Sequence, residues 1–227
     1  MSILNQILPE DWAKLLKDQE ELLLKIGKQV AERRQKVNVF PKSEEVFKAF
    51  WMCPLDKLRV IWIGQDPYPN LYKGEPVACG LSFAPRDPNY VPPSLRILSR
   101  CMQEDLGEGK VNWHALPGEG VLLLNSALTV EEGKPGSHVQ LWEDFTLALL
   151  QKIQHYNTGL VFVLLGKDAQ RFKPVISTFF NYIIERPHPV TEVYSGKKWE
   201  HNKLWSEIDE ICFKLNGDKI QWLNPLN

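Results

Sequence analysis

The feature that most constrains the fold is a set of short apolar runs that read as buried strands. They lie at residues 59–63, 120–124, 160–165 and, more weakly, 181–184. Continuous apolar strands that alternate with helices are typical of a parallel sheet covered on both faces. The pattern therefore predicts an α/β protein with three α/β/α layers around a central, mainly parallel, four-stranded sheet.

Amphipathic stretches between these runs predict the helices. They cover residues 9–36, 43–51, 94–106, 141–155, 167–179 and 201–215. The chain has 227 residues, a length that suits one domain or two small ones, and no Gly- or Ser-rich linker divides it. We expect a single domain over residues 1–227, in which helices of residues 1–52 pack on the α/β core.

The charge balance excludes a protein held on nucleic acid by bulk positive charge. Lys and Arg number 27 against 28 Asp and Glu, which gives a net charge of −1. The charge balance still allows a local basic face, because residues 166–203 hold seven basic and four acidic side chains. The same segment can also be an ordinary solvated surface.

Cysteine and histidine spacing does not indicate a metal site. The four cysteines form neither a C-x-x-C pair nor a disulfide framework, and the five histidines lack a ligand motif. Reduced thiols, the absence of a signal-peptide pattern and the absence of a run of ~20 apolar residues predict a cytoplasmic protein without a membrane span. We also expect the protein to be a monomer.

Polar residues follow the predicted strands at the point where each strand ends. They are Asp66, Asn125, Lys167 and His188. Ligands bind at the carboxyl ends of the strands in such sheets, so this convergence predicts an active site. Each residue also has a structural alternative: Asp66 can start a turn and Asn125 can cap the next segment. A histidine between Pro187 and Pro189 is harder to explain structurally, because two prolines fix the backbone.

Several short motifs follow one another in a fixed order over nearly the whole chain. They are Gly64-Gln65-Asp66-Pro67-Tyr68, Gly80-Leu81-Ser82-Phe83, Pro92-Pro93-Ser94-Leu95, Leu122-Leu123-Leu124-Asn125, Gly136-Ser137-His138, His188-Pro189 and Ile220-Gln221-Trp222. Together they resemble the motifs of uracil-DNA glycosylase, family 1 (Ung-type). The resemblance implies an enzyme that hydrolyses the N-glycosidic bond of uracil in DNA, releases free uracil and leaves an abasic site.

The resemblance implies a role for each residue of the site. Asp66 would orient water and stabilise the sugar cation, and His188 would stabilise the uracil anion, as a neutral imidazole. Asn125 would read the uracil edge, because an amide both donates and accepts hydrogen bonds. Phe83 would stack on the flipped base and Tyr68 would exclude a 5-methyl group. Gln65 would contribute its backbone near O2.

The DNA-binding residues and the partners also follow from the resemblance. The residues are Pro92, Pro93, Ser94, Ser137, His138, Gly166, Lys167, Pro189 and Val190. The implied partner is uracil-containing DNA, single- or double-stranded, with a proteinaceous inhibitor at the same face. No metal or cofactor is implied.

The chain departs from the family pattern in its DNA-facing loops. Pro69 stands where the family commonly has His, Lys167 where it has Ser, and Val190-Thr191-Glu192 where it has Ser-Pro-Leu. Val190 cannot grip a phosphate and Glu192 would repel one, whereas Lys167 can bind a phosphate as a point charge. Val193 or Tyr194 would then serve as the wedge that enters the duplex. We expect better activity on single-stranded than on duplex DNA.

Two other classes of protein remain open at this point. One is a non-catalytic DNA-binding or replication-partner protein on the same scaffold, and the other is a glycosylase for a different damaged pyrimidine. Retention of Asp66 and His188 argues against the first, and Tyr68 with Asn125 argues against the second.

Overall fold

A parallel four-stranded sheet forms the centre of the computed structural model, which describes residues 2–225. The strand order is β6-β2-β8-β9, and the strands are β2 (Val60–Gly64), β6 (Val121–Asn125), β8 (Val161–Leu165) and β9 (Tyr182–Arg186). All three neighbouring pairs are parallel. Every residue of β2, β6 and β8 is buried, which is why these strands have no polar alternation in the sequence. The predicted fold class is confirmed.

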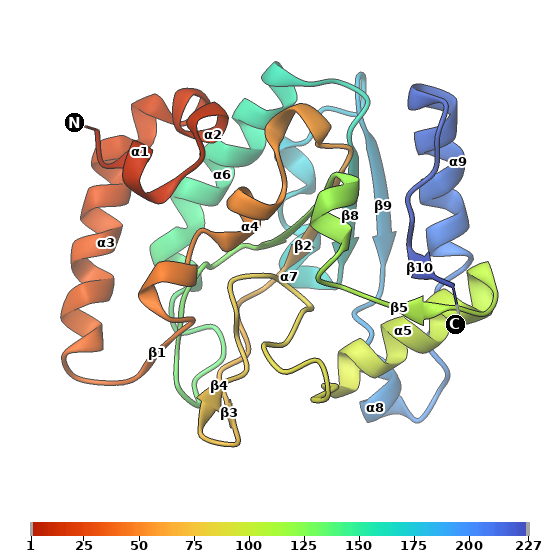
Figure 1. Cartoon of the computed structure of the whole chain (residues 1–227), viewed down its shortest axis with the longest axis horizontal. Coiled ribbons are helices and arrows are strands. Elements are labelled where there is room, and N and C mark those ends of the chain that lie inside the picture. The colour runs from red at the N-terminus through yellow and green to blue at the C-terminus, as the bar shows by residue number, and fades with distance from the viewer. Residues whose placement is uncertain (1, 226–227) are drawn as a thin grey trace.

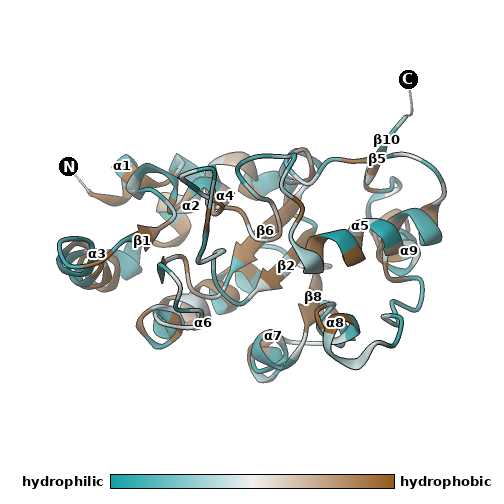
Figure 2. Cartoon of the chain, turned by 90° about the horizontal axis from the view of Figure 1, so that it is seen from below, coloured by the Kyte–Doolittle hydropathy of each residue, from teal (hydrophilic) through white to brown (hydrophobic). Residues whose placement is uncertain are grey.

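Helices cover both faces of the sheet. The helices are α1 (Leu4–Ile7), α2 (Glu10–Leu15), α3 (Glu20–Arg34), α4 (Lys48–Met52), α5 (Pro93–Leu106), α6 (Val139–Tyr156), α7 (Lys167–Gln170), α8 (Thr191–Ser195) and α9 (Leu204–Asn216). Figures 1 and 2 show α6 and α7 on one side of the sheet and α5 and α9 on the other. The N-terminal helices α2 and α3 pack against α6.

Short pairs of strands and 3-10 turns complete the fold. The antiparallel pairs join β1 (Val39–Phe40) to β7 (Val130–Glu131), β3 (Leu71–Tyr72) to β4 (Glu75–Pro76), and β5 (Lys110–Val111) to β10 (Leu223–Asn224). The 3-10 turns are η1 (Lys17–Gln19), η2 (Ser43–Glu45), η3 (Leu55–Lys57), η4 (Leu116–Glu119) and η5 (Lys173–Val175). Among residues 2–225, no helix has the length and apolarity that a membrane crossing requires.

Three predicted helices are shorter than their sequence patterns suggested. The helix expected over residues 43–51 is replaced by the 3-10 turn η2 and the short helix α4. The helix expected over residues 9–36 is interrupted between α2 and α3, where the 3-10 turn η1 follows Leu16 and the Leu16 side chain is fully buried. The helix expected over residues 167–179 is confined to α7 and the turn η5. Pro174 has no N–H to continue a helix. Phe179, which a helix over this range would place on its apolar face, is 84% exposed.

A tryptophan cluster supports the sheet beneath its carboxyl edge. Trp62, at the centre of β2, contacts the rings of Trp113, Trp205 and Trp222 at centroid distances of 5.9 to 6.2 Å. All four rings are buried. Tryptophan therefore supplies the core between the sheet and the α5–α9 layer.

Candidate active site

The carboxyl ends of the strands open into one pocket. The arrowheads of β8 and β9 point toward this edge, where α8 and the start of α5 also lie (Figure 1). The pocket has a volume of about 330 Å³, which suits a single aromatic ring system. Its lining residues are Gly64, Gln65, Asp66, Pro67, Tyr68, Pro69, Leu81, Phe83, Ser94, Asn125, Pro135, His188 and Val190. The structure thus brings together the six residues expected to perform chemistry and to bind the base.

Asp66 follows the end of β2 and is held by a backbone donor from another loop. Its Oδ2 accepts a hydrogen bond from the N–H of Gly136, 70 residues away in sequence. Burial raises the pKa of Asp66 above its usual value, while the Gly136 N–H opposes that rise. Its Oδ1 receives no hydrogen bond from residues 2–225, so that oxygen is open to a water molecule.

His188 follows β9 and carries its proton on the nitrogen that is left for a ligand. The N–H of Val190 donates to Nδ1 at 3.2 Å, so a neutral ring must hold its proton on Nε2. Burial lowers the pKa of His188 below its usual value, which favours this neutral form. The arrangement presents a neutral N–H donor to the pocket.

Asn125 is a buried amide with free hydrogen-bonding capacity. Its side chain is 7% exposed and forms no hydrogen bond with the residues described. Gly64 lies beside it in the neighbouring strand, and a Cβ at that position would lie 2.5 Å from Asn125 Oδ1. The missing side chain of Gly64 therefore makes room for the amide. A buried amide without a protein partner indicates a ligand that satisfies it.

Phe83 is a fixed aromatic wall of the same pocket. Its backbone adopts a φ of 59°, a left-handed conformation that is unfavourable for a bulky residue. The edge of Trp62 at 6.2 Å and the ring of Trp113 at 6.3 Å hold the phenyl group. Such local strain, maintained by packing, is frequent at binding sites.

Gln65 and Tyr68 complete the wall between the strand ends. The carbonyl of Gln65 accepts hydrogen bonds from Ser126 Oγ at 2.8 Å and from the N–H of Ala127 at 2.9 Å, which fixes this peptide. Tyr68 packs against the small apolar cluster of Phe40, Ala78 and Val130. Burial raises the pKa of the Tyr68 phenol above its usual range.

The predicted DNA-binding residues divide into an accessible set and a buried set. Ser94 and Val190 line the pocket itself, and Pro93, Ser137 and Lys167 are exposed, whereas Pro92, Gly166 and Pro189 are buried. His138 is also buried, at 4% exposure, and its Nδ1 shares a 2.8 Å hydrogen bond with Thr129 Oγ1. That burial does not offer a direct DNA contact. His138 anchors the loop that carries the Gly136 N–H.

Glu192 occupies a different environment from the one expected on sequence. Its two carboxylate oxygens bind the guanidinium of Arg100 on α5, at 2.8 and 2.6 Å, and Oε2 accepts the N–H of Trp199 at 2.7 Å. These contacts lower the pKa of Glu192 to about 2. Glu192 is therefore a brace that fixes α8 to α5, and its charge is already paired. The pair is 92 residues apart in sequence, and no motif signals it.

Comparison with known proteins decides the family. A profile of the Uracil DNA glycosylase superfamily matches residues 50–209, well over half of the chain. The chain belongs to the uracil DNA glycosylase superfamily. It is 33% identical over 217 residues to uracil-DNA glycosylase 1 of Listeria innocua, covering 93% of this chain and 96% of that protein. It is 36% identical over 197 residues to the uracil-DNA glycosylase of Aliivibrio fischeri, covering 85% and 86%.

A solved uracil-DNA glycosylase shows the same fold. The mimivirus uracil-DNA glycosylase superposes with a TM-score of 0.85 at 23% identity, covering 96% of this chain and 88% of that chain. A variant of the mimivirus protein was solved in complex with UGI. Within this superfamily fold, the pocket described above lies at the carboxyl edge of the sheet.

Proposed function

We propose that this protein is a uracil-DNA glycosylase that works at the pocket formed by Asp66, Asn125 and His188. The observation that carries the proposal is a pair of polar groups that no residue of 2–225 satisfies, the buried Asn125 amide and the Nε2–H of the half-buried His188, which both line one pocket. Membership of the superfamily and relatives named uracil-DNA glycosylase support it.

The reaction follows from the charges of these groups. Breaking the N-glycosidic bond develops positive charge on the sugar and negative charge on the departing base. The Asp66 carboxylate stabilises the cation and orients water through the oxygen that Gly136 leaves open. His188 donates from Nε2 to the developing anion, and as a neutral donor it needs no proton transfer.

Base selection uses shape and hydrogen bonding together. Asn125 can donate to a carbonyl oxygen and accept from a ring N–H, a pair that uracil presents and cytosine does not. Phe83 supplies a stacking face, and Tyr68 closes the side of the pocket on which thymine carries its methyl group. Fixed walls are expected to reject the methyl group because neither Phe83 nor Tyr68 is free to move aside.

DNA handling is proposed to depend on the short helix α8. Val193 is 55% exposed and Tyr194 83% exposed, on a helix that begins three residues after His188 and that the Glu192–Arg100 brace holds in place. Extruding a base costs a few kcal/mol, and apolar side chains that enter the vacated stack offset this cost. We assign the wedge to Tyr194, the more exposed of the two.

The proposed partners are uracil-containing DNA, single- or double-stranded, and a proteinaceous inhibitor at the pocket face. The proposal of an inhibitor is supported by the mimivirus structure, in which a related protein was solved in complex with UGI. The four cysteines are free and buried, which supports a location in a reducing compartment such as the cytoplasm.

The test is release of free base from otherwise identical oligonucleotides that carry uracil, thymine or cytosine at one position. The proposal predicts release of uracil alone, and loss of release in Asp66→Asn and His188→Leu. Release of a modified pyrimidine but not uracil would instead support a glycosylase for another damaged base. DNA binding without release of any base would support a non-catalytic protein.

A further inference from the structure

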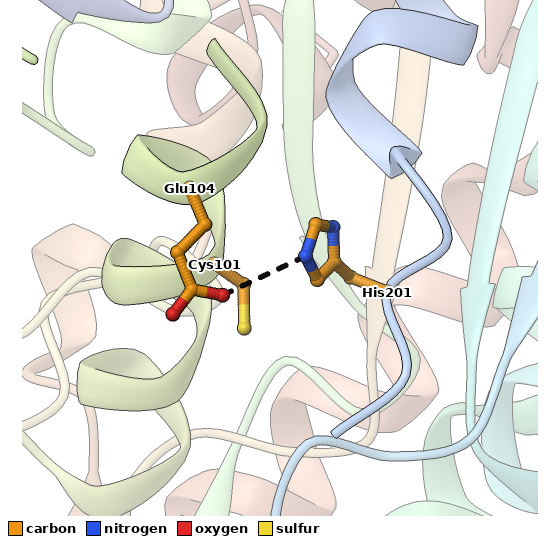
Figure 3. Close-up of side chains that lie close together, drawn as sticks. All are labelled: Cys101, Glu104 and His201. Atoms are coloured by element: carbon orange, nitrogen blue, oxygen red, sulfur yellow. Dashed lines mark ion pairs between the residues drawn. The ribbon is translucent and has the colours of Figure 1, made fainter. Parts of the chain in front are cut away.

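Three potential metal ligands meet between α5 and the segment that precedes α9. They are Cys101, Glu104 and His201, and one ligand atom from each lies within 4.8 Å of the others (Figure 3). Cys101 and Glu104 are three residues apart on α5, so both side chains lie on one face of the helix. His201 comes from the segment that precedes α9, and its Nε2 lies 3.8 Å from Glu104 Oε2.

The His201 ring is held in place before any ligand binds. Trp199 and Trp205 contact the ring at centroid distances of 6.3 and 5.9 Å, and Arg186 Nε donates to the His201 carbonyl at 2.9 Å. Its buried Nδ1 has no hydrogen-bond partner within residues 2–225. A fixed imidazole whose nitrogens form no short hydrogen bond has unused coordinating capacity.

The three ligands differ in burial in a way that leaves a path for an ion. Cys101 is fully buried, whereas the side chains of Glu104 and His201 are 33% and 17% exposed. Glu104 and His201 also line an open surface pocket with Lys197 and Lys198. An ion can therefore enter from solvent and reach the thiol from the outer side.

We propose that Cys101, Glu104 and His201 bind one divalent zinc-type ion, with solvent in the fourth position. A thiolate, an imidazole and a carboxylate are the ligands that zinc takes in proteins, and sulfur discriminates against Mg²⁺ and Ca²⁺. The thiolate and the carboxylate together balance the charge of the ion. The ion would join α5 to the segment before α9.

Two cations beside the site are compatible with an ion there. Lys198 Nζ contacts Glu104 Oε2 at 3.0 Å, but its side chain is 66% exposed and free to turn into solvent. Arg100 Nη2 donates to Cys101 Sγ at 3.5 Å while it binds Glu192. An N–H donor to the sulfur, outside the coordination sphere, is a common way to orient a thiolate ligand.

Titration of the full-length protein with Co²⁺, a coloured substitute for Zn²⁺, tests the proposal. It predicts one equivalent bound, a near-ultraviolet thiolate-to-cobalt absorption band, and bleaching of that band by one equivalent of Zn²⁺. The band should disappear in Cys101→Ser and weaken in Glu104→Gln and His201→Gln. It should persist in Cys212→Ser and His155→Gln, which alter a buried thiol and an imidazole elsewhere.

A second measurement guards against variants that misfold. Zn²⁺ should raise the melting temperature of the wild-type protein by more than that of Glu104→Gln, whose side chain lies at the surface. Glu104→Gln should keep the metal-free melting temperature and uracil release. Absence of the band, a band that survives in Cys101→Ser, or an equal Zn²⁺ shift in Glu104→Gln would overturn the proposal. None of these outcomes depends on glycosylase activity.

Discussion

At the scale of single residues, Asp66 and His188 lie in one pocket and burial shifts their pKa values toward each other. Burial raises the pKa of Asp66 above its usual value and lowers that of His188 below its usual value. The lowered pKa favours a neutral imidazole near pH 7, and the hydrogen bond from the Gly136 N–H favours the carboxylate form of Asp66 against the effect of burial. Two titratable groups with separated roles are a common pattern in active sites.

The buried carboxylate should cost stability while it supports catalysis. The folded-state pKa of Asp66 is raised, so its stabilising contribution is present below the unfolded-state pKa and lost as pH rises through the folded-state value. At pH 7 we expect Asp66→Asn to raise the melting temperature and to lower uracil release by about 100-fold or more. At pH 3 the two melting temperatures should converge. A lower melting temperature for the variant at pH 7 would contradict this explanation.

The pH profile of uracil release should depend on Asp66 rather than His188. As pH falls from neutrality, His188 stays neutral below the ordinary histidine pKa of 6.5, because burial lowers its pKa. The acidic limb of kcat/KM should lie below pH 6.5 and above the ordinary Asp value of 3.8, because burial raises the pKa of Asp66. An inflection at or above pH 6.5 that disappears in His188→Gln would argue against a neutral histidine.

At the scale of elements, the turn from β8 into α7 sets the position of His188. Gly166 has a φ of +82°, and a Cβ there would lie 2.7 Å from the Cβ of His188. Gly196 also has a positive φ, of +67°, but has open space around it, so it serves as a control for the contact with His188. Gly196→Ala should lose about 1–2 kcal/mol of stability from its left-handed backbone. Gly166→Ala should lose more, because a ψ of 170° places Gly166 in a region that is almost restricted to glycine.

The two glycine variants should differ in catalysis. We expect Gly166→Ala to lower uracil release about 100-fold because the new methyl group displaces His188, whereas Gly196→Ala should keep near wild-type rates. Rates are compared at a temperature where both variants are folded. Equal rates for the two variants would show that close packing at Gly166 does not position the histidine.

The brace between α8 and α5 makes a second prediction at this scale. Because the pKa of Glu192 is lowered to about 2, its stabilisation is full above the ordinary glutamate value of 4.5 and is lost as pH falls toward 2. Glu192→Gln should lower the free energy of unfolding by about 1 kcal/mol at pH 7, and less at pH 3. Glu143→Gln, which breaks the exposed pair with Arg171, should change it by only a few tenths of a kcal/mol. Equal effects of the two substitutions would contradict a structural brace.

How far the sequence predicts each element depends on whether the element's neighbours are local. The buried strands β2, β6 and β8 were predicted because residues covered on both faces produce unbroken apolar runs. Asp66, Asn125 and His188 were brought together because the ends of parallel strands share an edge. The break at Leu16 and the Glu192–Arg100 pair were not predictable, because each depends on contacts between distant segments.

At the scale of the whole molecule, the near-zero net charge hides an uneven distribution. Residues 166–203 carry +3 within a chain of net −1, and they supply His188, α8 and the exposed Lys197 and Lys198. Contacts from a few Lys and Arg side chains to the DNA phosphates make binding salt-dependent, but a few such contacts do not hold the protein tightly on DNA. This suits an enzyme that must leave its product.

The effect of removing the proposed wedge should depend on whether the DNA substrate is single- or double-stranded. Tyr194→Ala is expected to lower kcat/KM on duplex uracil DNA several-fold and to leave the single-stranded substrate nearly unchanged, because a single strand needs no side chain to replace the extruded base. Phe179→Ala, at an equally exposed aromatic of the predicted 167–179 segment, serves as the control. Equal losses on both substrates would remove Tyr194 as the wedge.

The central claim is that the chemistry of the pocket is intact while the DNA-facing loop is altered. The most direct measurement is the single-turnover rate of uracil release by the wild-type protein and Asp66→Asn, on one oligonucleotide used as a single strand and as a duplex. We predict release from both substrates by the wild type, faster from the single strand, and loss of both in Asp66→Asn. No release from either substrate, or undiminished release by Asp66→Asn, would contradict the claim, and equal or faster release from the duplex would contradict the altered loop.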